Sequence, residues 1–125
     1  MHKRLRRLSK EEARIGEKIL DALYHWTAEQ QYRVSYPSYD DLARDLDVSR
    51  EQLSWFFSEV LGDKFPSFRK RQRLAYAAFL MRNDATMPAS ASGQKAGIAD
   101  KSDFRRQFAE VFRMTPENWR ASSGR

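Results

Sequence analysis

Hydrophobic residues recur at helical spacing along most of the chain. In the first segment they follow Ser9, which forms a capping-box pattern with Glu12 and marks a helix start. This helix is expected to fade near Gln31, and its apolar face consists of Ile15, Ile19, Ala22, Leu23 and Trp26. The polar stretch Tyr32–Ser38 is expected to be a connection.

Capping signals predict two more helices before residue 62. Ser38 can cap a short helix that stops near Asp47. Ser49 and Gln52 form a second capping-box pattern, and the helix that they open is expected to end at Gly62. Glycine suits the left-handed conformation that often ends a helix.

The second half of the chain is predicted to be helical too. A long basic helix is expected from about Pro66 to Met81, which is sixteen residues. Residues 85–99, ATMPASASGQKAGIA, resemble a linker in composition, although the repeat described next assigns them a weak helix. Thr115, Pro116 and Glu117 predict a short last helix. Because no segment alternates with period two, the predicted fold class is all-α with about seven helices.

One sequence pattern occurs twice. FSEVL at Phe57–Leu61 returns fifty-one residues later as FAEVF at Phe108–Phe112. The N-cap candidates Ser49 and Asp100 lie at the same offset, and apolar residues follow each at four-residue intervals. When the first copy is shifted by fifty residues along the chain, its short helix and turn fall on residues 85–99. Each copy therefore predicts a helix-turn-helix, whose second helix reads the major groove of DNA.

The second helix of each copy has a predicted core face and a predicted outer face, at about 100° per residue. In the first copy the inward residues are Leu53, Phe56, Phe57 and Val60, and the outward ones are Glu51, Ser54, Trp55 and Ser58. In the second copy the inward residues are Phe104, Gln107, Phe108 and Val111, and the outward ones are Ser102, Arg105, Arg106 and Ala109, flanked by Lys101 and Asp103. An exposed tryptophan favours a contact with DNA or, alternatively, with another protein segment.

Positive charge is concentrated in two stretches. The net charge is +6, yet residues 1–10 carry five Lys or Arg and residues 64–83 carry six, both without acids, so the rest of the chain sums to −5. Such clusters are typical of polyanion binders, and a solvated surface is an equally good interpretation from charge alone. Residues 11–63 weaken the case for DNA, with twelve acids against five basic residues.

Composition argues against several classes of protein. A length of 125 residues with 41% hydrophobic content is enough for about one domain with a core. The chain has no Cys and only two His, which argues against zinc sites, thiol catalysis and disulfides. No catalytic triad pattern or Gly-rich phosphate loop is present, so we expect neither an enzyme nor a cofactor. No apolar run approaches the ~18 residues of a spanning helix, and we predict a cytoplasmic protein.

Three segments carry a resemblance to a known family. They are LARDLDVSREQLSWFFSEVLG at Leu42–Gly62, FPSFRKRQRLAYAAFL at Phe65–Leu80 and DKSDFRRQFAEVFRMTPENWR at Asp100–Arg120. Over about residues 10–120 the chain resembles the DNA-binding domain of the AraC/XylS family of bacterial transcription regulators. The resemblance implies two helix-turn-helix subdomains joined by a long helix. The expected division is a basic arm at 1–8, a first subdomain at 9–64, a connecting helix at 65–83 and a second subdomain at 84–121.

The resemblance also implies site residues and partners. The base-reading positions correspond to Glu51, Ser54, Trp55, Lys101, Ser102, Asp103 and Arg106. The expected phosphate contacts are Arg50, Arg69, Lys70, Arg71, Arg73 and Arg105. The implied partners are double-stranded DNA, RNA polymerase and a separate sensing or dimerisation part. The chain is then either a fragment of a larger regulator or a stand-alone monomer, and its basic start also suits a segment just inside a membrane.

The second copy departs from the family pattern. Ala89 and Ser92 stand where the family usually has bulky aliphatics, Gly93 where it has alanine, Ile98 where it has Phe and Arg113 where it has glycine. Each missing aliphatic costs ~2–5 kcal/mol at a buried site that cannot collapse. The second subdomain is therefore expected to be loosely folded, and Asp103 to repel phosphate unless it accepts from a cytosine amine.

Two functions remain open from the sequence. The favoured one is a sequence-specific binder of duplex DNA that regulates transcription. The alternative is a protein interaction module that keeps the fold, has lost specific DNA reading and docks a partner through Trp55 and the acidic first motif. Binding that survives high salt would favour the alternative, because phosphate contacts weaken steeply with salt.

Overall fold

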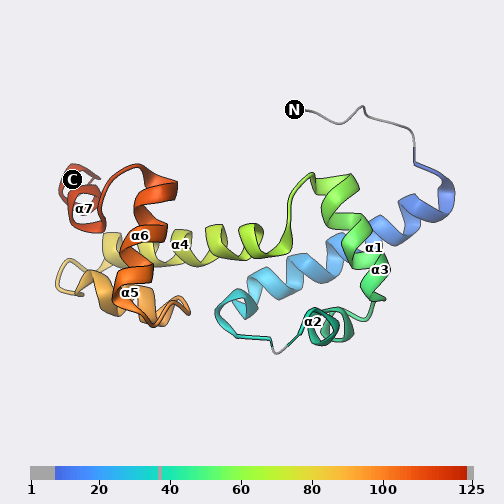
Figure 1. Cartoon of the computed structure of the whole chain (residues 1–125), viewed down its shortest axis with the longest axis horizontal. Coiled ribbons are helices and arrows are strands. Elements are labelled where there is room, and N and C mark those ends of the chain that lie inside the picture. Colours follow the sequence, from blue (N-terminus) through green and yellow to red (C-terminus); the bar gives the residue numbers. More distant parts are fainter. Residues whose placement is uncertain (1–7, 37, 124–125) are drawn as a thin grey trace. The chain divides into compact units, whose positions relative to one another are not determined.

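The computed structural model describes residues 8–36 and 38–123, and the described part contains helices and no strand (Figure 1). The α-helices are α1 Lys10–Ala28, α2 Tyr39–Asp45, α3 Arg50–Trp55, α4 Phe65–Asn83, α5 Ala89–Lys95, α6 Lys101–Phe112 and α7 Pro116–Ser123. A 3-10 turn, η1, covers Gln31–Arg33, and a π-helical segment, η2, covers Phe56–Leu61. The all-α prediction with seven helices is confirmed. Most of the predicted basic arm, residues 1–7, lies outside the described residues.

The helices begin at the residues that the capping signals predicted. Ser9 forms a reciprocal capping box with Glu12, and Ser49 forms one with Gln52. The Ser38 hydroxyl accepts from the Asp41 N–H, and the Asp100 carboxylate accepts from the Asp103 N–H. These side chains satisfy N–H groups that have no partner inside the helix.

The chain forms two compact units. Unit 1 contains the described residues up to Gln31 together with Tyr36–Phe65, and unit 2 contains Tyr32–Ser35 and the residues from Pro66 onward. Most of α4, which we expected as a separate connector, therefore belongs to the compact body of unit 2. The short segment Tyr32–Ser35, expected to be a mere connection, belongs there as well.

Unit 1 has an aromatic core. Trp26 of α1, Phe57 of η2 and Phe65 at the start of α4 are all buried. The Phe65 ring meets the edges of Trp26 and Phe57 at 5.7 Å and that of Tyr39 at 6.2 Å between centroids. Such edge-to-face pairs stabilise a core beyond the area that they bury. The core holds α2 and α3 against α1.

The core of unit 2 lies between α4, α5, α6 and α7. Its buried residues are Leu74, Ala77, Ala78, Met81, Ala96, Ile98, Phe104 and Phe108. The Phe108 and Phe112 rings stack at 4.3 Å, and Trp119 of α7 packs against both. This core fixes α6 by its apolar face.

The two copies share their backbone geometry. In the first, the Val48 N–H donates to the Ala43 carbonyl at 3.0 Å, and in the second the Ile98 N–H donates to the Gly93 carbonyl at 2.8 Å. The second helix of each copy ends in a left-handed residue, which is Gly62 with φ 64° in the first and Arg113 with φ 65° in the second. The predicted repeat is thus a repeat of structure, and residues 89–95 form the helix that their composition concealed.

Candidate nucleic-acid interface

The outer face of α3 carries the polar residues predicted for the first copy. Arg50, Glu51 and Ser54 are exposed. Arg50 pairs with Asp40 at 3.6 Å and lies over the Tyr39 ring, 5.9 Å from its centroid. Burial raises the pKa of the Tyr39 hydroxyl, while its hydrogen bond with Ser54 acts in the opposite direction. This face therefore offers a hydroxyl, a carboxylate and a guanidinium along one side of the helix.

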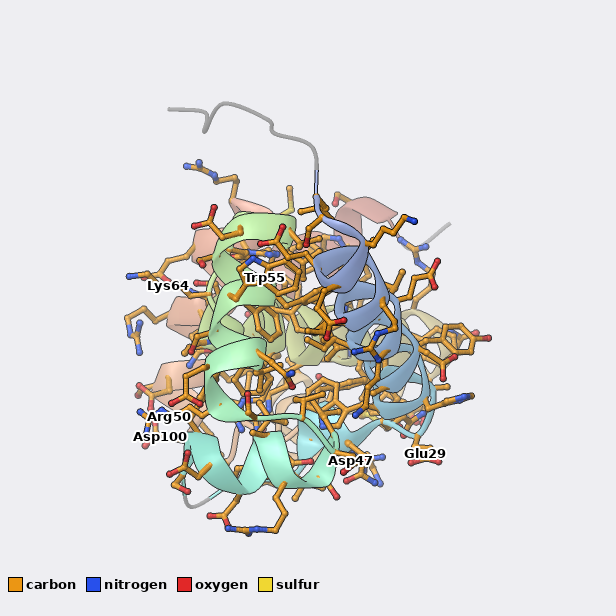
Figure 2. All side chains as sticks on the ribbon, turned by 90° about the vertical axis from the view of Figure 1, so that its right-hand side faces the viewer. Glu29, Asp47, Arg50, Trp55, Lys64 and Asp100 are labelled. Atoms are coloured by element: carbon orange, nitrogen blue, oxygen red, sulfur yellow. The ribbon has the colours of Figure 1, made fainter. Side chains whose placement is uncertain are left out.

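Trp55 does not have the full exposure expected from helical projection. Its side chain is half-buried and extends from α3 toward α1 (Figure 2). The Cη2 atom lies 3.8 Å from the place where a Cβ on Gly16 would stand. The indole nitrogen is buried and has no hydrogen-bond partner among the described residues. The expectation of an exposed tryptophan was wrong, because α1 reaches over the ring, and a direct base contact by Trp55 loses its main support.

The helix that contains FSEVL differs from the prediction in its second half. After Trp55 the backbone follows a π-helical path through Phe56–Leu61. Val60 and its counterpart Val111, both expected inward, are 41% and 37% exposed. Both valines lie in the last turn of their helices, beyond the innermost aromatic residues. The inward positions of Leu53, Phe56, Phe57, Phe104 and Phe108 are confirmed.

The first turns of α6 present the second set of predicted base readers. Lys101, Ser102, Asp103 and Arg106 are all exposed. The Arg106 guanidinium donates to the Asp103 carboxylate at 3.0 Å and pairs with Glu110 at 3.5 Å. The hydrogen bond with Asp103, followed by the charges of both acids, raises the pKa of Arg106. Asp103 thus lies beside a cation, which offsets the repulsion from phosphate that we expected of it.

Two cations beside this face are also held by acids. The Arg105 guanidinium binds Glu117 of α7 at 2.6 Å, and Lys70 of α4 pairs with Glu110 at 3.5 Å. Burial raises the pKa of Glu117, but its hydrogen bond with Arg105 and the nearby positive charges outweigh burial, so the net pKa is lowered. These exposed pairs contribute little stability, at most about 1 kcal/mol each, and phosphate can replace the carboxylates.

The Arg73 guanidinium makes hydrogen bonds within unit 2. Its Nε donates to the Tyr32 carbonyl at 2.5 Å, and an Nη group donates to the Val34 carbonyl at 3.3 Å. Burial, with a smaller effect from Arg69, lowers the pKa of Arg73 to about 10. The phosphate contact predicted for Arg73 loses support, because its guanidinium holds the segment Tyr32–Ser35 within unit 2.

Arg69 and Arg71 lie on the same helix with different surroundings. Arg69 donates to the Val34 carbonyl at 3.3 Å, so part of its hydrogen-bonding capacity is used within unit 2. Arg71 is exposed. Of the four basic residues predicted as anchors near the start of α4, Arg71 and Lys70 remain the best placed.

Sequence reasoning missed the role of Arg33. Its Nε donates to the Lys95 carbonyl at 2.5 Å, and its guanidinium lies 4.9 Å from the centre of the Tyr76 ring. It therefore ties the end of α5 to α4. The surrounding stretch has no apolar periodicity, and the only signal in the sequence was the pair of aromatic residues, Tyr32 and Tyr36, around it.

Each unit exposes hydrogen-bond donors and acceptors on one helix, α3 in unit 1 and α6 in unit 2. Among the described residues, no group of three or more His, Asp or Glu is placed to hold a metal ion. Within residues 8–36 and 38–123, no helix is both long and apolar enough to cross a membrane.

Comparison with known families agrees with this geometry. A family model described as a helix-turn-helix domain, of the AraC type, matches residues 42–122. The match begins within α2 and includes the whole of α3, α4, α5 and α6. None of the curated proteins matches the chain significantly.

Proposed function

The chain belongs to the AraC/XylS family of DNA-binding domains, and from this membership we propose that it binds double-stranded DNA sequence-specifically to regulate transcription. The observation that carries the proposal is the structural repeat. Two helices, Arg50–Leu61 and Lys101–Phe112, each follow a short helix and a tight turn and expose polar residues in their first turns. In helix-turn-helix proteins these are the positions that reach base edges in the major groove.

We assign base reading to Glu51 and Ser54 in unit 1, and to Lys101, Ser102, Asp103 and Arg106 in unit 2. Arg106 suits guanine reading, because a guanidinium can donate two hydrogen bonds to O6 and N7. Asp103 holds that guanidinium at 3.0 Å and would orient it, or accept from a cytosine amine beside it. Arg50, Lys70, Arg71 and Arg105 supply phosphate contacts, which carry affinity without sequence information.

The proposal places the domain in the cytoplasm of a bacterium, with DNA as its direct partner. RNA polymerase and a sensing or dimerisation part are further partners that this role would require in a larger regulator. The family consists of regulatory DNA-binding domains, so catalysis forms no part of the proposal.

The alternative, a protein interaction module, loses the docking anchor that was expected for it. Trp55 was to be its exposed anchor, and that ring is half-buried against α1. The acidic balance of residues 11–63 still favours the alternative. Salt dependence separates the two functions, since phosphate contacts weaken steeply with salt.

The direct test is selection from a random duplex library, followed by binding of the enriched duplex across a salt series. We expect an enriched site whose affinity falls steeply as salt rises. No enrichment, with weak binding that salt abolishes, would contradict sequence-specific reading. Tight binding to a protein that persists at high salt would favour the interaction module.

Two single variants test the site assignment on the enriched and a random duplex. Arg106→Ala should weaken the enriched duplex selectively, by about 1–3 kcal/mol. Arg71→Ala should weaken both duplexes alike and reduce the salt slope by about 1. Arg14→Ala is the matched control, because Arg14 is an exposed helical arginine of α1 already paired with Glu11, and no effect is expected. Equal losses on both duplexes for Arg106→Ala would remove it from the reading set.

A further inference from the structure

The turns of the two helix-turn-helix copies have different surroundings. In the first copy the turn contains Asp47, whose side chain is 97% exposed and pairs with the Lys18 ammonium at 3.9 Å. The corresponding residue of the second copy, fifty positions later, is Gly97. A Cβ on Gly97 would lie 2.8 Å from the Arg33 carbonyl oxygen, and its φ is 104°. The second turn is therefore closely covered by another stretch of backbone, which only glycine allows at this position.

The covering backbone belongs to the segment Tyr32–Ser35, the strap. It lies between α1 and α2 in the sequence, yet it is part of unit 2. Arg73 of α4 donates to the Tyr32 carbonyl at 2.5 Å and to the Val34 carbonyl at 3.3 Å. The Tyr32 ring is buried and meets the edge of the Tyr76 ring of α4 at 6.2 Å between centroids. The strap is thus fixed to α4 and contacts the second turn.

The internal repeat shows that α4 has exchanged a direct contact with the turn for a contact through the strap. Buried residues at the same spacing align α1 with α4, and they are Ile19, Leu23 and Trp26 in α1 and Leu74, Ala78 and Met81 in α4. In this alignment Lys18 corresponds to Arg73. Lys18 pairs with the first turn itself, at Asp47. Arg73 holds the strap, and its Nε lies 2.9 Å from the place of a Cβ on Gly97.

Arg33 connects the strap to the end of α5. Its Nε donates to the carbonyl of Lys95, the last residue of α5, at 2.5 Å. The last carbonyls of a helix have no partner within the helix, so this hydrogen bond caps α5. The Arg33 guanidinium also lies 4.9 Å from the centre of the Tyr76 ring. Arg33 therefore fixes the place at which α5 ends and the turn begins.

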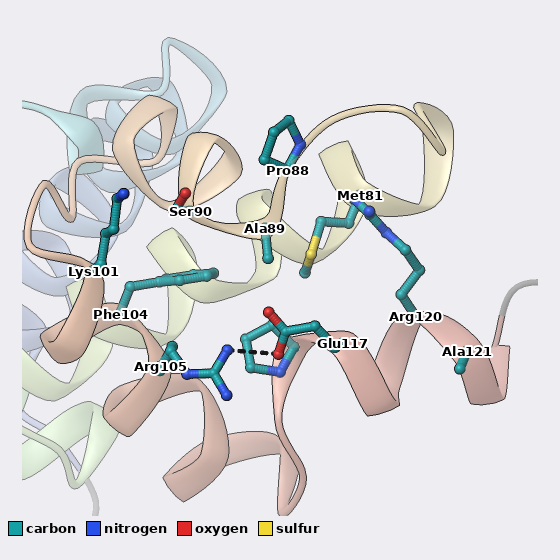
Figure 3. A pocket seen from close by; sticks show the side chains of 11 residues that line it. Met81, Pro88, Ala89, Ser90, Lys101, Phe104, Arg105, Glu117, Arg120 and Ala121 are labelled. Carbon is teal, nitrogen blue, oxygen red and sulfur yellow. Dashed lines mark hydrogen bonds and ion pairs between the residues drawn. The ribbon is translucent and has the colours of Figure 1, made fainter.

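The start of α6 depends on this turn. Figure 3 shows Phe104 of α6 pointing toward Met81 of α4, and both residues belong to the core of unit 2. The Arg105 guanidinium binds Glu117 of α7, the dashed contact in Figure 3. These contacts hold the apolar face and one side of α6. The turn leads directly into its first residue, Lys101, where the assigned base readers begin.

We propose that the strap positions the second helix-turn-helix for base reading, and that Arg33 is a positioning residue that sets sequence preference through α6. The proposal rests on the proposed function, because it takes α6 as a helix that reads bases. Without the Arg33 hydrogen bond, the end of α5 and the turn can shift, and the start of α6 shifts with them. A bidentate contact such as that assigned to Arg106 tolerates little displacement, because both of its hydrogen bonds require short distances.

A matched pair of variants, Arg33→Met and Arg33→Gln, tests the hydrogen bond. Both side chains are unbranched, uncharged and long enough to lie against the Tyr76 ring. The glutamine Nε2 occupies the same place along the side chain as the arginine Nε and can still donate to the Lys95 carbonyl, whereas methionine has a methyl group there. The two variants therefore differ chiefly in the donor.

The readout is the ratio of the affinities of the full chain for the duplex enriched from a random library and for a random duplex. Arg33→Met should lower this ratio about tenfold, and Arg33→Gln by less than about threefold. Arg14→Ala, which removes an exposed arginine paired with Glu11, is the control and should leave the ratio unchanged. An unchanged ratio in Arg33→Met would overturn the positioning role. Equal losses in Arg33→Met and Arg33→Gln would also overturn it, because they would identify a lost cation.

A second pair of variants approaches the contact from the turn. Gly97→Ala should displace the strap and lower the same ratio, while Asp47→Ala, at the corresponding place in the first copy, should leave the ratio unchanged. Amide NMR spectra show whether unit 2 stays folded in each variant, so a change of ratio in a folded variant is separated from a loss of stability. Equal ratios in folded Gly97→Ala and in the wild type would contradict the proposal.

Failure of the proposed function is distinguishable from failure of the strap. A chain that enriches no duplex would refute sequence-specific reading. The same spectra would then still test the strap, because the amide signals of Gly97, Ile98 and Lys101 should shift more in Arg33→Met than in Arg33→Gln. Equal shifts in the two variants would overturn the role of the Arg33 hydrogen bond in placing the turn.

Discussion

The two helix-turn-helix copies reach the same backbone geometry with different side-chain volumes. The first copy has Ala43 and Leu53 where the second has Gly93 and Phe104. The Phe104 ring lies 2.7 Å from the place where a Cβ on Gly93 would stand, so the larger residue on α6 occupies the room left by the smaller one on α5. Compared with the first copy, the second has a smaller side chain on α5 and a larger one on α6 at this contact.

A second exchange involves a buried hydroxyl. Ser92 is fully buried where the first copy has Leu42, and its hydroxyl donates to the Ala89 carbonyl at 2.6 Å. A buried polar group that is hydrogen-bonded avoids most of its desolvation penalty. Our expectation of a loosely folded second copy counted each missing aliphatic and left out the gain at Phe104.

The largest expected effect concerns Trp55 and Arg106, which occupy the same place in the repeat. Trp55→Ala should destabilise unit 1 by about 3 kcal/mol, because its ring packs under α1. Arg106→Ala should change the stability of unit 2 by less than about 0.5 kcal/mol, because its ion pairs are exposed. Urea unfolding, followed by the amide signals of each unit, measures both. Equal losses of unfolding free energy in the two units would show that Trp55 and Arg106 contribute equally to stability.

A smaller effect is expected from restoring the first copy's residue in the second. Gly93→Ala should destabilise unit 2 by about 2 kcal/mol, because the new methyl group meets the Phe104 ring. Adding Phe104→Leu, which recreates the first copy's pair, should recover a large part of that loss. The coupling of the two changes in a double-mutant cycle is the measured quantity. Simple additivity would contradict the exchange of volume between α5 and α6.

The smallest expected effect lies at the end of the second helix of each copy. Arg113 has φ 65° where Gly62 has φ 64°, and only glycine adopts this conformation at no steric cost. Arg113→Gly should therefore stabilise unit 2 by about 1 kcal/mol. Gly62→Ala is the mirror experiment and should destabilise unit 1 by a similar amount. A thermal scan with no rise in the midpoint for Arg113→Gly would show that the arginine makes a compensating contact.

Local signals in the sequence predicted much of the fold. The caps at Ser9, Ser38, Ser49 and Asp100 are where they were expected, because a side-chain oxygen and a free N–H lie within a few residues of each other. The helix of residues 89–95 could be recognised only through the repeat, since its composition is that of a linker.

The errors arose where distant segments meet. Projection around one helix shows which residues share a face, but it cannot show that α1 covers Trp55 or that Arg73 reaches the Tyr32 carbonyl. Charge counts likewise treat every arginine as solvated, although Arg73 is used inside unit 2.

The central claim is that both copies read bases, and hydroxyl-radical footprinting on the selected duplex tests it most directly. The chain should protect two blocks whose centres lie about one helical turn, or 10 base pairs, apart. Arg106→Ala should remove protection of one block and leave the other. A single protected block, unchanged by Arg106→Ala, would contradict the claim and leave base reading to unit 1 alone.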